Sequence, residues 1–304
     1  MNKVLITGAY GFIGRHVARE YSSRGWHVTG IGHGEWSNWH DYGLTEWHKA
    51  DVTLDSLLTL SNYPDVIIHC AGGASVGFSV EQPAIDFDLT VRTTSNVLEF
   101  IRLYSPSTKL VYPSSAAVYG QVEALPITED MPLNPVSPYG THKQMSEILC
   151  QLYSRQYNLS VAIVRMFSIY GPELRKQLLW DACQKLHQDD YAFFGTGEEI
   201  RDWLHVDDVS KLLYVASQNA TVDCPVVNAG KGMGVKVKNI LEQLCGQYES
   251  NIKPTFSSTF KPGDPNAYIS DISKASAWGW TPLVNWQEGI SEYVDWYNKC
   301  QKFE

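Results

Sequence analysis

The first half of the chain alternates short apolar runs with stretches of helical periodicity. The apolar runs lie at residues 3–9, 27–32, 65–72, from 109 onward, and 159–171. The helical patterns lie at residues 13–25, 96–106 and 138–158. Strands that are apolar throughout, rather than at alternate positions, are typical of a parallel sheet buried on both faces. The alternation of strands and helices therefore predicts an α/β fold with a doubly wound parallel sheet.

The alternation ends near residue 171. Beyond it, helical, turn-rich and loop-rich segments follow one another without a regular order, and no internal repeat is present. Ligands of open α/β sheets bind at the carboxyl ends of the strands, so we expect this part to lie over that edge. We therefore predict a sheet domain at residues 1–170 and a smaller, irregular C-terminal lobe at residues 171–304. Residues 201–232 are expected to return to the first domain.

The composition excludes several classes of protein. The 304 residues are 44% hydrophobic and 19% charged, as in ordinary globular proteins. The net charge of −9, without a basic stripe, argues against a nucleic-acid partner. No apolar run reaches the ~18 residues that a membrane span needs, and the six cysteines form no CxxC motif. A strand pattern that begins within three residues of Met1 leaves no room for a signal peptide. These features predict a cytoplasmic protein with reduced thiols, no membrane partner and no zinc site.

A glycine-rich loop joins the first predicted strand to the first predicted helix. Gly8, Gly11 and Gly14 give it the spacing GxxGxxG. In this context the first glycine forms the tight turn, the second lets the backbone approach a pyrophosphate, and the third lets the helix pack on the strand. The amides at the helix N-terminus then face the phosphates. The loop therefore predicts that residues 1–170 form a dinucleotide-binding Rossmann domain.

A tyrosine and a lysine lie four residues apart at the start of the predicted helix 138–158. Tyr139 and Lys143 therefore project from one face of that helix. Ser137 is its predicted N-cap and Pro138 its first residue. A nearby ammonium group favours the phenolate, so Lys143 is expected to lower the pKa of Tyr139 towards neutrality. The pair has the chemistry of a general acid and base for interconverting a carbinol and a carbonyl.

Two serines precede this pair in the chain. Ser114 and Ser115 stand at the end of the strand that begins at residue 109. A serine hydroxyl in that place can hydrogen-bond the reacting oxygen of a substrate. A tyrosine and a lysine at this spacing occur by chance in many sequences, whereas the glycine loop, the serines and the pair in this order form a specific pattern.

These motifs resemble those of the extended short-chain dehydrogenase/reductase family, in its branch of NAD(P)-dependent nucleotide-sugar epimerases, dehydratases and reductases. The resemblance covers nearly the whole chain, and the motifs occur in the family's order. They are GxxGxxG at 8–14, HCAGGASVGFSVEQP at 69–83, SSAAVYG at 114–120, SPYGTHK at 137–143, VRMFSIYGP at 164–172, RDWLHVDD at 201–208 and KPGD at 261–264. The resemblance implies a nicotinamide cofactor, a nucleotide-diphosphate sugar bound by the lobe 171–304, and a homodimer that pairs through helices such as 138–158.

The resemblance also implies roles for individual residues. Tyr139 is the catalytic acid and base, Lys143 contacts the nicotinamide ribose, and Ser115 contacts the reacting oxygen of the sugar. The expected cofactor contacts are Gly8, Tyr10, Gly11, Phe12, Ile13, Gly14, Arg15, His33, Asp51, Val52, Cys70, Ala71, Gly72, Tyr139 and Lys143. The expected substrate contacts are Ser75, Ser114, Ser115, Ser168, Arg201 and Lys261. For the HVDD segment at 205–208 the resemblance implies a structural role rather than a metal site.

Two departures from the family pattern narrow the chemistry. The family's dehydratases and related decarboxylases carry a glutamate, often after an aspartate, directly behind the catalytic serine or threonine, where this chain has Ala116 and Ala117. Methyl groups cannot transfer protons, so both reactions are disfavoured. Ser168 stands where an asparagine usually contacts the sugar nucleotide, so this contact is expected to differ.

The end of the second predicted strand lacks the acidic residue that usually holds the adenosine ribose of NAD. Gly32 stands there, followed by His33. A carboxylate would repel the 2′-phosphate of NADP, whereas glycine leaves space. Arg15 is always charged and forked, which makes it a stronger candidate than His33 to bind that phosphate. These residues favour NADP over NAD, although Glu35 could supply the missing acid from the loop.

The expected function follows from the cofactor. A ketone reductase consumes NADPH, whereas an epimerase recycles its own bound NAD. The sequence therefore favours an NADPH-dependent reductase of the C4 ketone of a nucleotide-diphosphate 4-keto-6-deoxyhexose, with Tyr139 as proton donor. One alternative is an NAD-dependent nucleotide-sugar 4-epimerase similar to UDP-glucose 4-epimerase. Another, from a different class, is a non-catalytic nucleotide-binding protein, which the intact set of Ser115, Tyr139 and Lys143 argues against.

Overall fold

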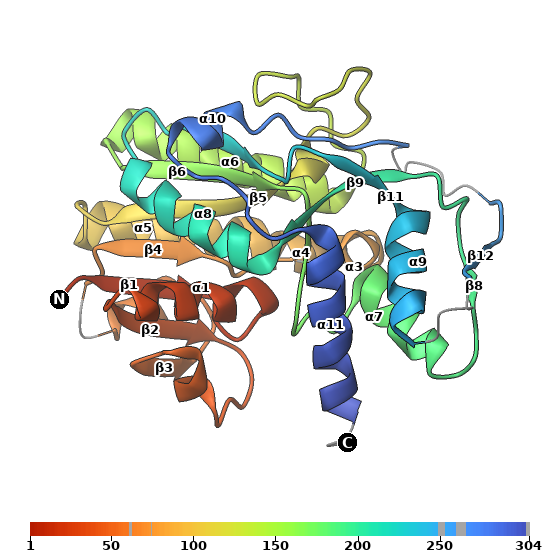
Figure 1. The fold of residues 1–304 in the computed structure, drawn as a ribbon. Helices are drawn as coiled ribbons and strands as arrows, with labels where there is room; N and C mark the ends of the chain where they lie inside the picture. Colours follow the sequence, from red (N-terminus) through yellow and green to blue (C-terminus); the bar gives the residue numbers. More distant parts are fainter. Residues whose placement is uncertain (61–62, 74, 249–252, 260–265, 302–304) are drawn as a thin grey trace.

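The computed structural model describes residues 1–60, 63–73, 75–248, 253–259 and 266–301 (Figure 1). Its main feature is a seven-stranded sheet in the order β3-β2-β1-β4-β5-β6-β10, in which every neighbouring pair is parallel. The strands are β1 Lys3–Thr7, β2 His27–Gly32, β3 Glu46–Lys49, β4 Val66–His69, β5 Lys109–Ser115, β6 Val161–Met166 and β10 Val226–Ala229. The first six follow the strand order of a Rossmann fold, so the predicted fold class is confirmed. The order reverses between β1 and β4, which is where such folds bind their ligands.

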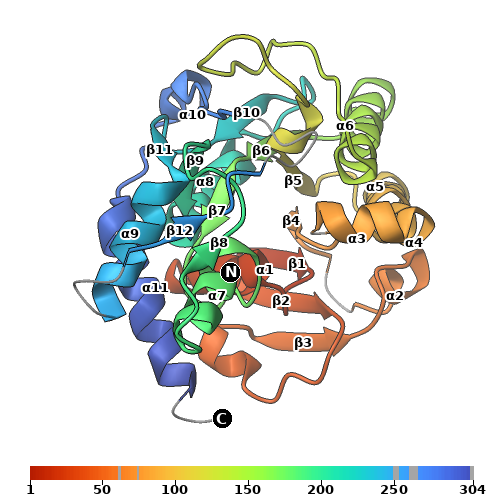
Figure 2. The ribbon, with the colours of Figure 1, turned by 90° about the vertical axis from the view of Figure 1, so that its right-hand side faces the viewer.

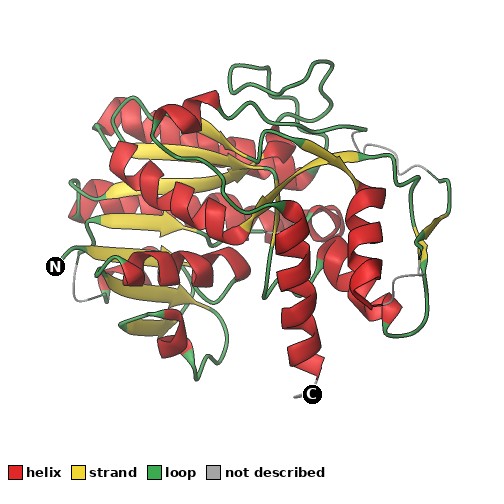
Figure 3. Ribbon diagram, in the orientation of Figure 1, coloured by secondary structure: helices red, strands yellow, loops and turns green. Residues whose placement is uncertain are grey.

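Helices cover both faces of the sheet (Figures 2 and 3). On one face lie α1 Phe12–Ser23 and α8 Val206–Asn219, and on the other lie α2 Leu54–Leu58, α5 Thr93–Tyr104 and α6 Pro138–Tyr157. Successive residues of β1 show the division. Val4 and Ile6 pack into the core beneath α1 and α8, whereas Leu5 packs into the core beneath α5 and α6. The side chains of a strand point alternately to its two faces, which explains why these strands are apolar throughout.

The C-terminal half adds a separate, smaller core. It is built from α7 Gln177–Leu186, α9 Val237–Tyr248 and α11 Trp286–Gln301, packed beside a three-stranded sheet of β7 Ser168–Tyr170, β9 Ile200–His205 and β11 Gly234–Lys236. A two-stranded sheet pairs β8 Ala192–Phe193 with β12 Thr255–Phe256. In Figure 1, α7, α9 and α11 of this core lie beyond the carboxyl ends of the main strands.

Short helical segments complete the chain. They are η1 Trp39–Tyr42, α3 Val76–Glu81, α4 Pro83–Phe87, the π-helical turn η2 Asp88–Arg92, η3 Ala116–Val118 and α10 Ser273–Ala277. Of these, α3 and α4 pack against α6 and so help to enclose its N-terminal half.

The predicted elements match the structure where the local pattern is strong. The predicted strand 27–32 coincides with β2, and the predicted helix 138–158 ends one residue beyond α6. The sequence analysis did not predict β3. Strand β10 joins the main sheet beside β6, whereas the division into residues 1–170 and 171–304 stays a prediction. None of the helices described here combines the length and the apolar character that crossing a membrane requires.

Candidate active site

The glycine loop forms a tight turn between β1 and α1. Gly8 has a left-handed φ of 67°, and a Cβ added to it would come within 2.7 Å of the Ala71 nitrogen. A Cβ on Gly14 would overlap the carbonyl oxygen of Gly8. Gly11 caps α1 without a side chain, and no acidic residue occupies the first turn. The loop therefore has the shape and the exposed helix N-terminus that a dinucleotide pyrophosphate requires.

The loop after β4 borders the glycine loop. The Ala71 amide donates to Thr7 Oγ1 at 3.2 Å, and the same hydroxyl lies 2.7 Å from Nδ1 of His69. Burial lowers the pKa of His69 to about 3, so its ring is neutral. Gly72 follows with a φ of 153°, and a Cβ there would lie 3.7 Å from Lys143 Nζ. This segment of expected cofactor contacts is therefore fixed between the glycine loop and Lys143.

The start of α6 is built as predicted. Ser137 Oγ accepts a hydrogen bond from the Gly140 amide at 3.2 Å, and Pro138 is the first helical residue. The Tyr139 amide donates to Ser79 Oγ of α3 at 3.0 Å. The cap and this bond together fix the turn that carries Tyr139.

Ser115, Tyr139 and Lys143 come together at the end of β5. Ser115 hydrogen-bonds the Tyr139 side chain, and its Oγ accepts from the Ala117 amide at 3.2 Å. The buried Lys143 donates to the Pro113 carbonyl at 3.0 Å. Its Nζ also lies 5.0 Å from the centre of the Tyr112 ring. The three predicted catalytic residues thus lie close together, where the end of β5 meets the N-terminal part of α6.

The proton affinities in this site are set mainly by burial. Burial raises the pKa of Tyr139, the bond with Ser115 lowers it, and the charge of Asp86 raises it. The predicted lowering of the Tyr139 pKa by Lys143 is therefore wrong, because desolvation of the phenolate dominates. Burial also lowers the pKa of Lys143 to about 8. Lys143 is therefore still mostly in its ammonium form at neutral pH and loses its proton not far above it.

The predicted substrate contacts are dispersed. Ser114 is fully buried and donates to Glu147 Oε1 at 2.5 Å, so its hydroxyl is engaged in the core. Ser75 caps α3 and accepts from the Phe78 amide at 3.3 Å. Ser168 begins β7, and Arg201 of β9 donates to the Ile200 carbonyl at 2.9 Å. Lys261 lies outside the described residues. Of this set, Ser115 is the residue that contacts Tyr139.

Gly32 leaves less space than expected. A Cβ at this position would lie 3.3 Å from the Trp47 ring and 3.6 Å from the Gly8 Cα. Trp47 belongs to β3, so the unpredicted strand fills the region beside Gly32. Whether this position leaves space for a 2′-phosphate stays a prediction, with the Trp47 ring packed on one side of it.

Arg15 is already engaged by neighbouring groups. Its Nη2 donates to the Tyr10 carbonyl at 2.6 Å, and Nη1 lies 3.6 Å from Glu173 Oε2. The guanidinium also lies 5.0 Å from the centre of the Tyr42 ring and 5.6 Å from that of Trp36. A carboxylate and three aromatic rings, counting that of Tyr10, thus surround Arg15, and a phosphate would have to compete with Glu173.

Two acidic groups lie near the end of β2. His33 Nε2 is 3.2 Å from Asp51 Oδ1, and both side chains are largely exposed. Glu35 forms an ion pair with Lys49. Asp51 thus places a carboxylate beside His33. His33 is the residue that follows Gly32, where the usual acidic residue is missing. Val52, the next of the expected cofactor contacts, is buried.

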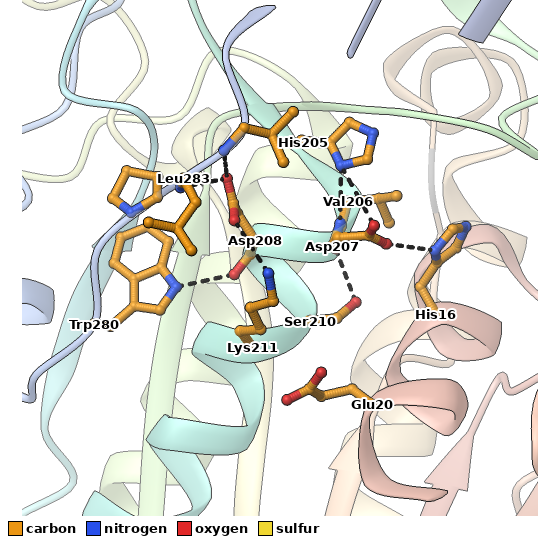
Figure 4. Close-up of polar contacts among 12 residues, drawn as sticks. His16, Glu20, His205, Val206, Asp207, Asp208, Ser210, Lys211, Trp280 and Leu283 are labelled. Carbon is orange, nitrogen blue, oxygen red and sulfur yellow. Dashed lines mark hydrogen bonds and ion pairs between the residues drawn. The ribbon is translucent and has the colours of Figure 1, made fainter. Parts of the chain in front are cut away.

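The HVDD segment connects distant parts of the chain (Figure 4). The Asp207 amide donates to His205 Nδ1 at 3.3 Å, which caps α8. The buried Asp208 carboxylate accepts from the amides of Leu283 and Val284 at 2.9 and 2.8 Å. Its carbonyl accepts from Trp280 Nε1 at 3.0 Å. Within the described residues no group of three or more His, Cys, Asp or Glu side chains is arranged to hold a metal ion.

Three residues of the site were missed in the sequence. Asp86 and His142 form a buried pair at 2.6 Å next to Tyr139 and Lys143. Glu173 contacts Arg15, and it also accepts from Tyr42 Oη at 3.0 Å. The position of His142 between Tyr139 and Lys143, the two predicted catalytic residues, was the available signal, whereas the contacts of Asp86 and Glu173 are long-range and leave no local pattern.

The comparisons with known proteins now identify the family. The model of the NAD-dependent epimerase/dehydratase family matches residues 4–230. The chain belongs to this family. A relative with 30% identity is the UDP-glucose 4-epimerase of Mycolicibacterium smegmatis, and the alignment covers 98% of this chain and 100% of the relative.

Solved structures of the family superpose closely. The UDP-glucose 4-epimerase of Thermotoga maritima with UDP-glucose matches with a TM-score of 0.88 and 26% identity, over 98% of this chain and 99% of that one. The UDP-glucuronic acid 4-epimerase of Bacillus cereus, with UDP-glucuronic acid and NAD, matches with a TM-score of 0.86 and 26% identity over the same shares. These findings give no support to the expected 4-ketoreductase. They fit the epimerase alternative better.

Proposed function

We propose that this protein is an NAD-dependent nucleotide-sugar 4-epimerase. The observation that carries the proposal is the hydrogen-bonded pair of Ser115 and Tyr139 with Lys143 beside it, next to the glycine loop. The relatives named as UDP-sugar 4-epimerases support the choice of reaction. Ala116 and Ala117 beside Ser115 supply no acid for dehydration.

NAD is the proposed cofactor, as in the related UDP-glucuronic acid 4-epimerase structure that holds NAD. The packing of Trp47 beside Gly32 and the ion pair of Arg15 with Glu173 support this choice over NADP. The glycine loop, Asp51, Val52 and the segment 70–72 would hold NAD. When bound, NAD supplies the group that accepts hydride from the sugar and returns it.

The proposed role of Tyr139, with Ser115 and Lys143 beside it, is to transfer one proton. Tyr139 takes the proton from the 4-hydroxyl group when the sugar is oxidised and returns it when the ketone is reduced. Ser115 hydrogen-bonds the same oxygen. Lys143, held by the Pro113 carbonyl, is proposed to contact the nicotinamide ribose. Each direction of the reaction uses the same three residues.

The nucleotide sugar is proposed to bind over the carboxyl ends of the strands, between residues 1–170 and the lobe 171–304. Arg201 of β9 is the proposed diphosphate contact among the described residues, because an arginine forms forked, charge-assisted bonds to phosphate. Lys261 stays a prediction for the same role. Ser75 and Ser168 remain proposed sugar contacts.

The test is to incubate the purified protein, without added cofactor, with UDP-glucose or UDP-glucuronate and to follow the appearance of the C4 epimer by proton NMR. We expect interconversion in both directions, with NAD released when the protein is denatured. Tyr139→Phe is the control and should lose the activity. Loss of NADPH absorbance at ~340 nm with a 4-keto-6-deoxysugar, without interconversion, would instead establish the reductase. Binding without either reaction would establish the non-catalytic alternative.

A further inference from the structure

A buried acid–imidazole pair lies directly behind the proposed catalytic residues. Asp86 of α4 is fully buried, and its Oδ2 accepts from Nδ1 of His142 at 2.6 Å. His142 is 8% exposed and lies on α6 between Tyr139 and Lys143. A carboxylate in such surroundings is stable in its ionised form only when donors compensate for its lost water. The hydrogen bond from His142 supplies that compensation for Oδ2, whereas Oδ1 is buried without a hydrogen-bond partner among the described residues.

The pair reaches the site through the turn after β4. A Cβ on Gly73 would overlap Oδ1 of Asp86, whereas a Cβ on Gly72 would lie 3.7 Å from Lys143 Nζ. The Gly73 amide donates to Thr90 Oγ1 at 2.9 Å, which holds the turn in place. These two glycines therefore lie between the carboxylate of Asp86 and the ammonium of Lys143, with no side chain of their own to separate the charges.

Several titratable groups face Lys143 from the elements packed around it. They are His69 and Cys70 at the end of β4, Tyr112 of β5, Asp86 of α4, and Tyr139, His142, Glu147 and Cys150 of α6. Four of these groups favour the ammonium form, namely Cys70, Asp86, Glu147 and Cys150. The question is which of the four carries a negative charge that is not already neutralised.

Three of the four are poor counter-charges. Burial raises the pKa of Cys70 to about 12 and that of Cys150 well above its usual value, so both thiols are neutral near pH 8. Glu147 accepts from Nη2 and Nε of Arg165 at 2.8 and 3.1 Å, so its charge is balanced by a guanidinium. Asp86 contacts the His142 ring rather than a lysine or arginine, and its Oδ1 has no hydrogen-bond partner among the described residues.

We propose that Asp86, hydrogen-bonded to His142, is the counter-charge that holds Lys143 in its ammonium form beside Tyr139. Asp86 and His142 are positioning residues, because they act on the reaction through Lys143. The same carboxylate opposes ionisation of Tyr139 and raises its pKa. The pair thus keeps the proton on both groups up to a higher pH than burial alone would allow.

The decisive measurement is the titration of Lys143 itself. Protein labelled with [ε-¹³C]lysine is titrated by NMR, and the Lys143 signal is assigned by its disappearance in Lys143→Met. We expect a midpoint at about 8 in the parent protein. In Asp86→Asn the midpoint should fall by about one pH unit, the shift typical of a nearby opposite charge. An unchanged midpoint in a folded Asp86→Asn variant would overturn the proposal.

Asp88→Asn is the matched control. Asp88 follows two residues later, is exposed, and forms an ion pair with Arg92 at 2.8 Å. Its replacement removes the same charge on the same side of α6 and should leave the Lys143 midpoint unchanged. An equal fall in both variants would show that overall charge is responsible, and this would also overturn the proposal.

Two variants at His142 test its role. His142→Asn keeps an N–H donor and should retain the parent midpoint, whereas His142→Leu removes the donor and should lower the midpoint towards that of Asp86→Asn. A parent-like midpoint in His142→Leu would remove His142 from the proposal. If Asp86→Asn does not fold, the Lys143 midpoint in the two His142 variants still tests the proposal.

The consequence for turnover rests on the proposed epimerase function, whereas the lysine titration does not. The alkaline limb of kcat/KM against pH should move down by the same unit in Asp86→Asn. A shifted titration in a protein without epimerase activity would support the charge pair and contradict the proposed function. A shifted titration with an unmoved alkaline limb would show that Lys143 does not govern that limb.

Discussion

Tyr139 is the residue on which turnover is expected to depend most. Tyr139→Phe removes the transferable proton and keeps the ring, so we expect epimerisation to slow by about 10²–10⁴-fold, the usual contribution of a general acid–base group. NAD content and thermal stability should stay close to those of the parent protein, since the Tyr139 amide still bonds Ser79. Near-parental turnover with an unchanged pH profile would remove Tyr139 from its proposed role.

Arg15 is the side chain that can best test the preference between NAD and NADP. Because Glu173 and the Tyr10 carbonyl already engage its guanidinium, we expect Arg15→Ala to change the affinities for NADH and NADPH by similar factors. Both affinities can be measured by titrating the reduced cofactors into protein freed of bound nucleotide and following their fluorescence. If the affinity for NADPH falls more than tenfold further than the affinity for NADH, Arg15 binds the 2′-phosphate of NADPH. That result would favour the reductase over the epimerase.

Single residues were predictable from the sequence where their role depends on the local backbone. Gly8 and Ser137 belong to this class, because a tight turn and a helix cap leave fixed spacings. Ser114 does not, since its bond to Glu147 joins residues 33 positions apart. The surroundings of Gly32 were not predictable for the same reason, because Trp47, which packs beside it, belongs to a strand without a strong local pattern.

At the scale of elements, the strength of the local pattern decided what could be predicted. The helix α6 has a cap, a proline at its first position and twenty residues of helical periodicity. The strand β3 has four residues, EWHK, at the edge of the sheet, and none of them is fully buried. A short polar edge strand lacks the apolar run that marks the central strands, so only the pairing with β2 defines it.

The N-terminal turn of α6 matters for the proposed reaction, because it holds Tyr139 in place. Ser137→Ala removes the hydrogen bond to the Gly140 amide, and we expect a loss of about 1 kcal/mol in the free energy of unfolding. Urea titration followed by circular dichroism measures it. Ser137→Asp keeps an acceptor and adds a charge that suits a helix N-terminus, so it should restore the stability. Equal losses in both variants would mean that the cap is not what stabilises this turn.

At the scale of the whole molecule, the C-terminal half depends on contacts that the sequence does not reveal. The segment 280–284 is fastened to α8 by bonds to Asp208 from Trp280, Leu283 and Val284. A motif rich in His and Asp suggests a metal site when read alone, yet here its groups cap a helix and hold a loop. The resemblance to a family supplied this interpretation, because residue types and spacing alone favour neither role.

The outer face of α6 carries an apolar stripe that bears on assembly. Met145, Ile148 and Leu152 are 41%, 54% and 42% exposed, and their spacing places them on one side of the helix. The neighbouring α5 exposes Leu103 and Tyr104 as well. An apolar patch shared by two adjacent helices is typical of an interface between subunits. It supports the predicted homodimer, in which the α6 helices of two copies would pack together.

The dimer prediction can be tested by reversing the character of one residue in this stripe. Light scattering after size-exclusion chromatography should give twice the chain mass of 34.2 kDa for the parent protein. Ile148→Glu places a charge at the centre of the stripe, where an interface would have to desolvate it, so we expect the monomer mass. Leu283→Glu changes a residue that is 68% exposed on the C-terminal segment and should leave the dimer intact. A monomeric parent protein, or an Ile148→Glu variant that stays dimeric, would place the stripe outside any subunit interface.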